Sequence, residues 1–237
     1  MTREAFIATL APYAIQARIE GSPLLASVRL AQNVLETGGV LPQTNNLGGY
    51  KAGDGKPTAH WNGQVANKST WEVINGKRVE TTAAFRVYES IAAFYKDQDL
   101  LLRQPRYQAV RSARTPESQA TALQQSGYAT DPAYASKLKA LIHHYQLERF
   151  DARVEEELRM AQETRMEQQL DAVGRQLEEL KRSLEQLDRR TRQIEAPAWA
   201  AAAAAHFDAY IDTPKGSYDF WRLLTVLYRQ QAGGAGE

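Results

Sequence analysis

Apolar residues recur every three or four positions along the first forty residues of the chain. This helical period runs through residues 3–20 and again through residues 22–39. In the second stretch it falls on Leu24, Leu25, Val28, Ala31, Val34 and Leu35. The Gly-Ser-Pro sequence between the two stretches is too short to separate them widely. The pattern therefore predicts two helices that pack against each other.

The second predicted helix carries its own start and stop signals. Ser22 can cap it, Pro23 suits its first turn, and Gly38 with Gly39 supplies a left-handed stop. Glu36 then lies in the last turn, on a polar face with Gln32, where the negative end of the helix dipole and any burial favour a protonated carboxyl. We interpret Glu36 as a candidate general acid. The alternative is an ordinary surface glutamate.

Glycine and proline dominate residues 37–63, which we expect to form loops and short strands in a lobe of their own. Residues 69–74 and 77–82 are β-prone runs joined by Asn75-Gly76, a combination that predicts a hairpin with a two-residue type I′ turn. The predicted register pairs Ile74 with Lys77, Glu72 with Val79, and Trp71 with Glu80. By alternation, Glu72 shares a face with Thr70 and Ile74 and points either into a cleft or to solvent.

Helical periodicity returns after residue 81. It predicts helices over residues 84–95, 100–103, 118–125 and 134–145. Asp131-Pro132 can cap and open the last of these. Tyr128 stands in the preceding turn, where it either takes part in a site or packs over the edge of the core.

Residues 151–195 differ in kind from what precedes them. Apolar positions alternate in steps of four and three over about four heptads, between polar and charged residues. The seam consists of Met166, Leu170, Val173, Leu177, Leu180, Leu184, Leu187, Thr191 and Ile194, with Gly174 as a weak position. We expect it to mediate homo-oligomerisation; packing onto the same chain is the alternative.

The end of the chain is rich in aromatic residues. Pro197 is expected to end the heptad helix, after which two amphipathic helices follow at residues 199–210 and 218–229. Their aromatic side chains either form a small core or bind a ligand. The predicted division is therefore 1–150 for the main domain, 151–196 for a coiled-coil helix, and 197–237 for a helical module.

Composition and charge restrict the function. Residues 1–150 hold 17 Lys and Arg against 12 Asp and Glu. This mild positive charge suits binding to an anionic polymer, but it is far from the dense basic patch of a nucleic-acid-binding protein. The chain lacks cysteine, and its four His residues, at 60, 143, 144 and 206, lack metal-ligand spacing, so we expect neither metal nor cofactor. We also expect no membrane span and no signal peptide, because long apolar runs are missing.

Four ordered motifs within residues 4–150 resemble one family, the bacterial endo-β-N-acetylglucosaminidases of glycoside hydrolase family 73. The segments are residues 22–38 around Glu36, Asn-Asn-Leu-Gly-Gly-Tyr-Lys-Ala at 45–52, Ala-Phe-Arg-Val-Tyr at 84–88, and Gly-Tyr-Ala-Thr-Asp-Pro at 127–132. Three departures stand beside them: the family's Trp after Glu-Ser-Gly is missing, Gly48 replaces Phe, and Tyr50 replaces Ile.

The resemblance implies a lysozyme-like α+β fold, mainly α, with a cleft between a helical lobe and a small β-lobe. It also implies hydrolysis of the β-1,4 bond between N-acetylglucosamine and N-acetylmuramic acid in peptidoglycan glycan strands. Glu36 would be the proton donor, Glu72 (or, less well, Glu80) the second carboxylate, and Tyr128 an assisting residue. The implied substrate-binding residues are Asn46, Tyr50, Trp61, Trp71, Arg86, Tyr88 and Asp131.

Several alternatives remain at this stage. A nearby second carboxylate would act as nucleophile and a distant one would activate water, while the substrate acetamide can itself attack. The protein would be a phage or prophage endolysin released through a pore, or a host enzyme that reaches the wall by another route. A non-catalytic glycan-binding or tail-assembly protein and a lytic transglycosylase are the competing functions.

Overall fold

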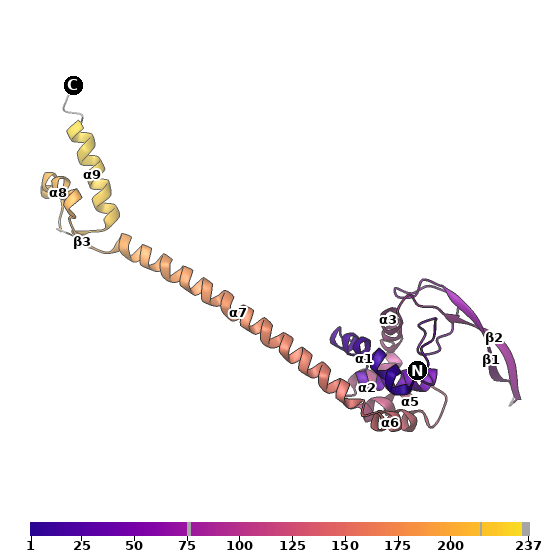
Figure 1. The fold of residues 1–237 in the computed structure, drawn as a ribbon. Coiled ribbons are helices and arrows are strands. Elements are labelled where there is room, and N and C mark those ends of the chain that lie inside the picture. The colour runs from indigo at the N-terminus through magenta and orange to yellow at the C-terminus, as the bar shows by residue number, and fades with distance from the viewer. Residues whose placement is uncertain (75–76, 214, 234–237) are drawn as a thin grey trace. The chain divides into compact units, whose positions relative to one another are not determined.

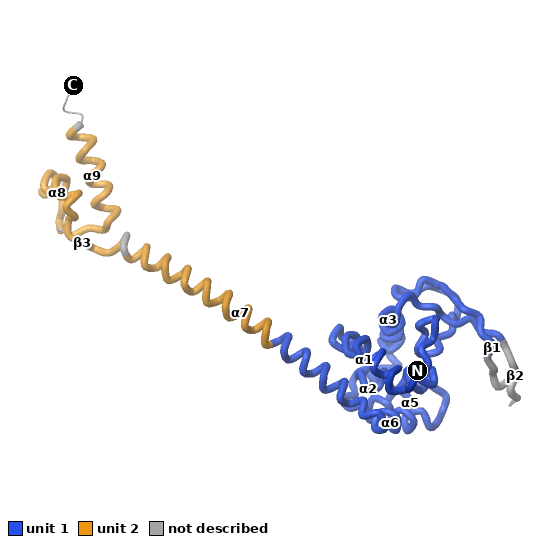
Figure 2. The backbone as a smooth tube through the Cα atoms, viewed as in Figure 1, with its two compact units in different colours: residues 1–162 blue, residues 163–237 orange. Residues whose placement is uncertain are grey.

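The computed structural model describes residues 1–74, 77–213 and 215–233; for residues 70–81, 189 and 190 it describes at most the backbone. The described chain divides into two compact units, residues 1–162 and 163–237 (Figure 2). The fold is mainly helical with one long two-stranded sheet, which confirms the expected α+β class. The division into three domains at residues 150 and 196 stays a prediction.

The first unit is built around a nearly fully buried helix, α2 (Ala26–Thr37). Helices α1 (Arg3–Ile19), α5 (Pro116–Gln125) and α6 (Tyr134–His144) pack against it (Figure 1). Burial covers every residue of α2 from Ala26 to Val34, including the polar side chains of Arg29, Gln32 and Asn33. Neighbouring segments supply hydrogen bonds to Arg29, Gln32 and Asn33 where water does not reach them. Ser27 Oγ, Arg29 Nε and Asn33 Nδ2 are buried without a hydrogen-bond partner.

The start of α2 differs from the prediction, whereas its end agrees. The helix begins at Ala26 rather than at Ser22, and its N-cap is Leu25, whose apolar side chain cannot accept a hydrogen bond. Oδ1 of Asp151, from the first turns of α7 (Glu148–Thr191), instead accepts from the Ser27 amide at 3.0 Å. Gly38 ends the helix in the left-handed conformation, with φ of +68°, as expected.

The side chain of Ser22 does not cap α2 as predicted, but bonds to Asp99 and Arg29. Its hydroxyl donates to Oδ1 of Asp99 at 2.8 Å and accepts from the Arg29 guanidinium at 2.6 Å. The side chain therefore connects the turn before α2 to α3 (Ile91–Leu102) instead of capping α2.

The hairpin of β1 (Val65–Ile74) and β2 (Lys77–Arg86) has the predicted register. Ile74 pairs with Lys77, Glu72 with Val79, and Trp71 with Glu80. The predicted type I′ turn at Asn75-Gly76 lies outside the described residues.

The helix predicted over residues 84–95 is wrong in its first half. Residues 84–86 continue β2, because the Tyr50–Ala52 segment pairs with them through hydrogen bonds from Ala52 N to Ala84 O and from Arg86 N to Tyr50 O. The helix itself, α3, starts at Ile91 behind a Ser90 cap and runs without interruption to Leu102. Short elements η1 (Pro105–Tyr107) and α4 (Gln108–Ser112) lead on to α5.

The second unit begins within α7 and continues through a short C-terminal array. That array contains β3 (Ile194–Glu195), η2 (Ala198–Ala200), α8 (Ala201–His206), η3 (Asp208–Tyr210), β4 (Lys215–Gly216) and α9 (Tyr218–Gly233). Trp221 is 1% exposed and donates from Nε1 to Ile194 O at 3.0 Å, so part of the aromatic content forms a small core.

Three predictions for this unit need correction. Helix α7 ends at Thr191, before Pro197, and Ile194 leaves the heptad seam to pair with Gly216 in the β3–β4 sheet. The predicted helix over residues 199–210 consists of the short elements η2, α8 and η3.

No helix in the described ranges is both long enough and apolar enough to serve as a membrane span.

Asp151 provides a test of how α2 is anchored. Replacing it with Ala removes the acceptor for the Ser27 amide, so we expect the free energy of unfolding to fall by about 1 kcal/mol, as for a lost helix cap. Asp151→Asn keeps a side-chain oxygen and should retain most of the stability. Urea unfolding followed by tryptophan fluorescence checks both variants; equal stability of Asp151→Ala and wild type would contradict the role.

Candidate active site

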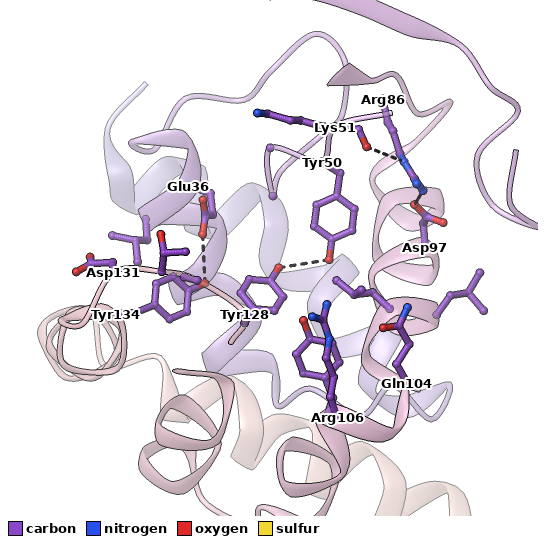
Figure 3. A pocket seen from close by; sticks show the side chains of 18 of the residues that line it. Glu36, Tyr50, Lys51, Arg86, Asp97, Gln104, Arg106, Tyr128, Asp131 and Tyr134 are labelled. Carbon is purple, nitrogen blue, oxygen red and sulfur yellow. Dashed lines mark hydrogen bonds and ion pairs between the residues drawn. The ribbon is translucent and has the colours of Figure 1, made fainter. Parts of the chain in front are cut away.

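A cleft of about 1000 Å³ opens in the first unit (Figure 3). Its walls come from the end of α2, the glycine-rich loop before β1, the end of α3, and the loop between α5 and α6. The lining residues are Leu35, Glu36, Gly48, Gly49, Tyr50, Lys51, Thr58, Arg86, Asp97, Leu100, Leu101, Gln104, Arg106, Tyr107, Tyr128, Ala129, Thr130, Asp131 and Tyr134. The cleft thus gathers predicted site residues from four separate segments of the sequence.

Glu36 lies where this cleft meets a second hollow of about 360 Å³. The second hollow is lined by Asn46, Gly49, Lys68 and Phe85 among others, and it shares Glu36 and Gly49 with the cleft. Glu36 therefore borders two adjoining hollows.

The carboxyl of Glu36 lines the cleft and is partly buried. Burial raises its pKa above the ordinary range, and the hydroxyl of Tyr134, which donates to Oε1 at 3.2 Å, partly offsets that rise (Figure 3). The direction expected from the sequence is therefore confirmed. A raised pKa keeps more of the carboxyl protonated near neutral pH, as a general acid requires.

Tyr128 and Tyr50 face each other across the cleft. Their hydroxyl oxygens are 3.4 Å apart (Figure 3), and Tyr128 also accepts from Nε2 of Gln98 at 3.0 Å. Burial raises the pKa of Tyr128 to about 12, so its hydroxyl stays neutral and can donate a hydrogen bond at physiological pH. The structure thus brings both predicted tyrosines to the groove near Glu36.

The packing around residue 48 explains why glycine stands there in place of the family's phenylalanine. A Cβ at this position would lie 2.9 Å from Cζ of Phe94 and 3.0 Å from the Tyr50 ring, too close for any side chain. The rings of Tyr50 and Phe94 meet edge to face, with centroids 5.5 Å apart. In this chain, therefore, Phe94 and Tyr50 together fill the space beside residue 48.

Arg86 lines the cleft but is held there by structural contacts. Its guanidinium donates to Oδ2 of Asp97 at 2.8 Å and stacks 4.4 Å from the centre of the Trp61 ring. Asp97, which is 3% exposed, also accepts from Tyr88 at 2.6 Å and from Thr58 at 2.6 Å. This cluster joins the base of the hairpin to α3 and so connects two walls of the cleft.

Trp61 and Tyr88, for which the resemblance implies substrate binding, do not line the cleft. Each side chain is only 2% exposed, with Trp61 Nε1 donating to Gln64 O and the Tyr88 hydroxyl donating to Asp97. Both border a separate hollow of about 390 Å³ instead of the cleft. Aromatic rings so covered support the wall of the cleft, because an exposed ring face is needed to stack on a sugar.

Asn46 acts mainly as a clamp for the loop that carries Tyr50. Its amide nitrogen donates to Tyr50 O at 2.9 Å and to Arg86 O at 3.0 Å, and its oxygen accepts from Tyr50 N at 2.8 Å. The residue borders the hollow next to Glu36. Asn46 therefore fixes the backbone from which Tyr50 enters the cleft.

Asp131 lies on the cleft but is not the helix cap that we predicted. Helix α6 begins at Tyr134 with Ala133 as N-cap, while Asp131 accepts from the Ala133 amide and forms an ion pair with Lys137 at 2.6 Å. The hydrogen bond from Lys137 and the one from the Ala133 amide lower the pKa of Asp131, so this carboxylate stays ionised.

The side chains of Trp71, Glu72 and Glu80 lie outside the described residues. The backbone register places Glu72 opposite Val79 and Trp71 opposite Glu80, near the far end of the hairpin. Their roles at the site stay predictions.

Sequence reasoning missed three contributors to the site: Tyr134, Asp97 and Gln98. Tyr134 had been identified only as the start of a helix. Asp97 and Gln98 belong to a run of four polar residues, 96–99, inside the otherwise apolar α3, and the last three of them are buried. Consecutive polar residues in a helix of that composition are the signal that could have located them.

Among the described residues, no group of His, Asp and Glu side chains could hold a metal ion.

A groove with a partly buried carboxyl and neutral tyrosine hydroxyls, set in a mainly helical domain, is the arrangement of a lysozyme-like glycoside hydrolase. Residues 11–147 match the family model described as "Glucosaminidase: Mannosyl-glycoprotein endo-beta-N-acetylglucosaminidase". This match covers more than half of the chain, and the chain belongs to the glucosaminidase family.

Curated and solved relatives agree with that assignment. Peptidoglycan hydrolase FlgJ of Salmonella typhimurium is 44% identical over 117 residues, which cover 48% of this chain and 37% of that protein. Exo-glucosaminidase LytG of Bacillus subtilis is 33% identical over 159 residues, covering 63% and 54%. The chain thus spans only about a third to a half of these two relatives.

Two solved structures share the fold. A truncated glycoside hydrolase domain of Salmonella typhimurium FlgJ is 39% identical, with a TM-score of 0.50, and covers 61% of this chain and 98% of that one. The catalytic domain of the autolysin Auto from Listeria monocytogenes is 28% identical, with a TM-score of 0.53, and covers 63% and 88%.

The Asp97 cluster makes a prediction about the wall of the cleft. Asp97→Ala leaves the buried Tyr88 hydroxyl and the Arg86 guanidinium without their acceptor, so we expect the free energy of unfolding to fall by about 3 kcal/mol. Tyr88→Phe removes one hydrogen bond and leaves the ion pair intact, so its loss should be nearer 1 kcal/mol. Denaturant unfolding compares the two; equal losses would show that the ion pair does not anchor the hairpin.

Proposed function

We propose that this protein hydrolyses the β-1,4 bond between N-acetylglucosamine and N-acetylmuramic acid in peptidoglycan. The observation that carries this proposal is the position of Glu36, a carboxyl of raised pKa that lines both the cleft and the adjoining hollow. Family membership supports the same reaction class. The printed names of the relatives, peptidoglycan hydrolase and exo-glucosaminidase, support a wall glycan as the substrate.

In the proposed reaction Glu36 donates its proton to the glycosidic oxygen as the bond breaks. The leaving sugar takes that proton, and positive charge develops on the anomeric carbon and ring oxygen of the other sugar. Attack by water, directly or after an intermediate has formed, completes the hydrolysis. Tyr128, with a neutral hydroxyl in the groove, would orient the sugar by donating a hydrogen bond.

Glu72 is our candidate for the second carboxylate, with Glu80 as the weaker one. A second carboxylate near the anomeric carbon would act as nucleophile, and a more distant one would activate water. If the substrate acetamide attacks instead, Glu72 needs only to orient and stabilise it. Glu36 borders two adjoining hollows, which favours cleavage within a strand over removal of a terminal sugar.

We also propose that the protein acts on the bacterial wall after release from the cytoplasm, as a phage or prophage endolysin or as a host autolysin. The mild positive charge of residues 1–150 supports an encounter with an anionic wall polymer.

Glu36→Gln tests the central assignment. The amide cannot supply the proton, so we expect hydrolysis to be abolished while binding to purified wall is retained. Digestion of peptidoglycan followed by mass spectrometry identifies the ends: reducing N-acetylglucosamine ends support the proposal, and anhydro-muramyl ends would indicate a lytic transglycosylase. Near-normal turnover by Glu36→Gln would remove Glu36 as the acid, and wall binding by wild type without product would favour a non-catalytic glycan-binding protein.

Glu72→Gln tests the second carboxylate in the same digestion assay. We expect a strong loss of rate, because the positive charge of the transition state would lose its countercharge or its nucleophile. Glu80→Gln is the matched control at the neighbouring hairpin position. A normal rate in Glu72→Gln with a loss in Glu80→Gln would exchange the two roles, and normal rates in both would favour attack by the substrate acetamide alone.

We propose further that the apolar stripe of α7 pairs with a second copy of the chain. The stripe consists of the residues Met166, Leu170, Val173, Leu177, Leu180, Leu184 and Leu187, which are 52 to 65% exposed in the single chain. The flanking positions on one side are Gln169, Gln176 and Ser183, and those on the other are Glu167, Gly174, Lys181 and Asp188. One side carries no charge, so parallel copies would bring no like charges together beside the seam.

Sedimentation equilibrium of the full chain tests this association. Wild type should have at least twice the monomer mass. The double variant Leu177→Lys, Leu180→Lys should have the monomer mass, because burying unpaired lysine charges between two helices is unfavourable. Gln168→Lys with Gln186→Lys adds the same charge away from the stripe and should keep the wild-type mass. A monomeric wild type at tens of micromolar would overturn the proposal.

A further inference from the structure

A continuous series of buried hydrogen bonds leads from Arg29 to Glu36. Arg29 donates to Oε1 of Gln98 at 2.8 Å, and Nε2 of Gln98 donates to Oε1 of Gln32 at 3.1 Å. Nε2 of Gln32 donates to the Tyr134 hydroxyl at 2.9 Å, and that hydroxyl donates to Glu36 at 3.2 Å. The series crosses three helices, since Arg29, Gln32 and Glu36 belong to α2, Gln98 to α3 and Tyr134 to α6.

The direction of every bond in this series is fixed at its Arg29 end. A guanidinium only donates hydrogen bonds, so the amide oxygen of Gln98 must face Arg29 and its NH₂ group must face away. Gln32 then accepts with its oxygen and donates with its nitrogen, and the Tyr134 hydroxyl, which accepts from Gln32, directs its proton to Glu36. Turning either amide around would put two donors against each other.

Arg29 is itself held in place. It is fully buried, stacks 4.3 Å from the centre of the Tyr95 ring, and forms an ion pair with Asp99. The ion pair and the hydrogen bond to Ser22 hold the guanidinium in one orientation. A fixed cation at one end polarises the hydrogen bonds that follow it.

Gln98 is the branching point. Its NH₂ group donates to Gln32 and also, at 3.0 Å, to the Tyr128 hydroxyl. Tyr128 thereby fills one acceptor position and has its proton available for Tyr50 or for a sugar in the groove. A single buried amide thus biases two cleft tyrosines, Tyr134 and Tyr128, toward donating.

We propose that Gln98 is a positioning residue that, through Gln32, directs the Tyr134 proton onto Glu36 and so sets the protonation equilibrium of the catalytic acid. The catalytic part of this inference rests on the proposed function; the effect on Glu36 does not. Donation from Tyr134 stabilises the ionised carboxylate and opposes the effect of burial. The acid therefore keeps a raised pKa but can lose its proton within the catalytic cycle.

Other ionisable groups also face this part of the groove. In the described part of the chain they are Tyr128 and Asp131 from the α5–α6 loop, Tyr50 and Lys51 from the loop before β1, Lys68 from β1, Arg86 from β2, Asp97 from α3, and Arg106 and Tyr107 from η1. Arg3 from α1 contacts Gly38 O at the end of α2. The test must therefore change the series of hydrogen bonds without changing any charge.

NMR titration of the Glu36 side-chain carboxyl in the full chain provides that test. Tyr134→Phe removes the donor, so the pKa of Glu36 should rise further above that of wild type. Gln32→Met should raise it in the same direction, and so should Gln98→Met, which is two hydrogen-bonding partners away from Glu36. Gln98→Met combined with Tyr134→Phe should add nothing to Tyr134→Phe alone, because both changes act through the same hydroxyl.

Gln119→Met is the matched control. Gln119 is a buried glutamine that bonds to backbone atoms of Leu25, Pro23 and Val110, outside the series, so its loss should lower stability without moving the Glu36 pKa. A folded Gln98→Met variant with a wild-type Glu36 pKa would overturn the proposal. If Gln98→Met does not fold, an unchanged pKa in Gln32→Met would overturn it equally.

The pH dependence of hydrolysis separates this inference from the proposed function. If Glu36 is the acid, the alkaline limb of the rate profile should move to higher pH in Gln98→Met and Gln32→Met, because the acid stays protonated to higher pH. Shifted titrations in a chain that never hydrolyses peptidoglycan would support the positioning role and overturn the proposed function. Folded variants that hydrolyse peptidoglycan with an unshifted alkaline limb would support the proposed function and overturn the positioning role of Gln98.

Discussion

The burial of α2 is the constraint on which the first unit depends. Arg29 lies at its centre, and removing a guanidinium from water is costly unless a carboxylate and further acceptors replace the water. Asp99, Ser22 and Gln98 supply those acceptors, so α3 and the turn before α2 must take the positions that the structure gives them. The helix that carries Glu36 in its last turn is thereby held in place, and so is the backbone from which the Glu36 carboxyl extends.

The second wall of the cleft depends on another buried acidic residue. Asp97 receives hydrogen bonds from Thr58, Arg86 and Tyr88, which belong to the segments on either side of the hairpin and to its last strand. Both ion pairs therefore use neighbouring residues of α3: Asp99 faces α2, and Asp97 faces the β-lobe. One helix holds the two sides of the groove at a set distance, which a site for a rigid glycan requires.

The candidate active site and the exposed apolar stripe belong to different compact units. The groove lies within residues 1–162, and the exposed apolar stripe lies within residues 163–237. An exposed stripe of leucine on an otherwise polar helix is unfavourable in water, whereas the same residues are stabilising once a partner helix covers them. The stripe is therefore the feature of the second unit on which the proposed pairing of two chains rests.

The sequence by itself determined the local features of the protein. Periodicity located α1, α5 and α6 closely, Asn75-Gly76 set a register that the strands confirm, and Gly38 marked the end of α2 and so placed Glu36 in its last turn. Ordered motifs then indicated the family. These signals succeed because they depend on backbone conformation and on residues a few positions apart.

Only the tertiary structure decided which side chains meet. Asp151 caps a helix more than a hundred residues away, Ala84 to Arg86 extend a strand because Tyr50 to Ala52 pair with them, and Trp61 and Tyr88 are covered rather than exposed. Tyr134 reaches Glu36 across 98 positions of sequence. Hydrogen bonds between distant segments leave no period in the sequence, so neither the series from Arg29 to Glu36 nor the Asp97 cluster could be recognised before the helices were packed.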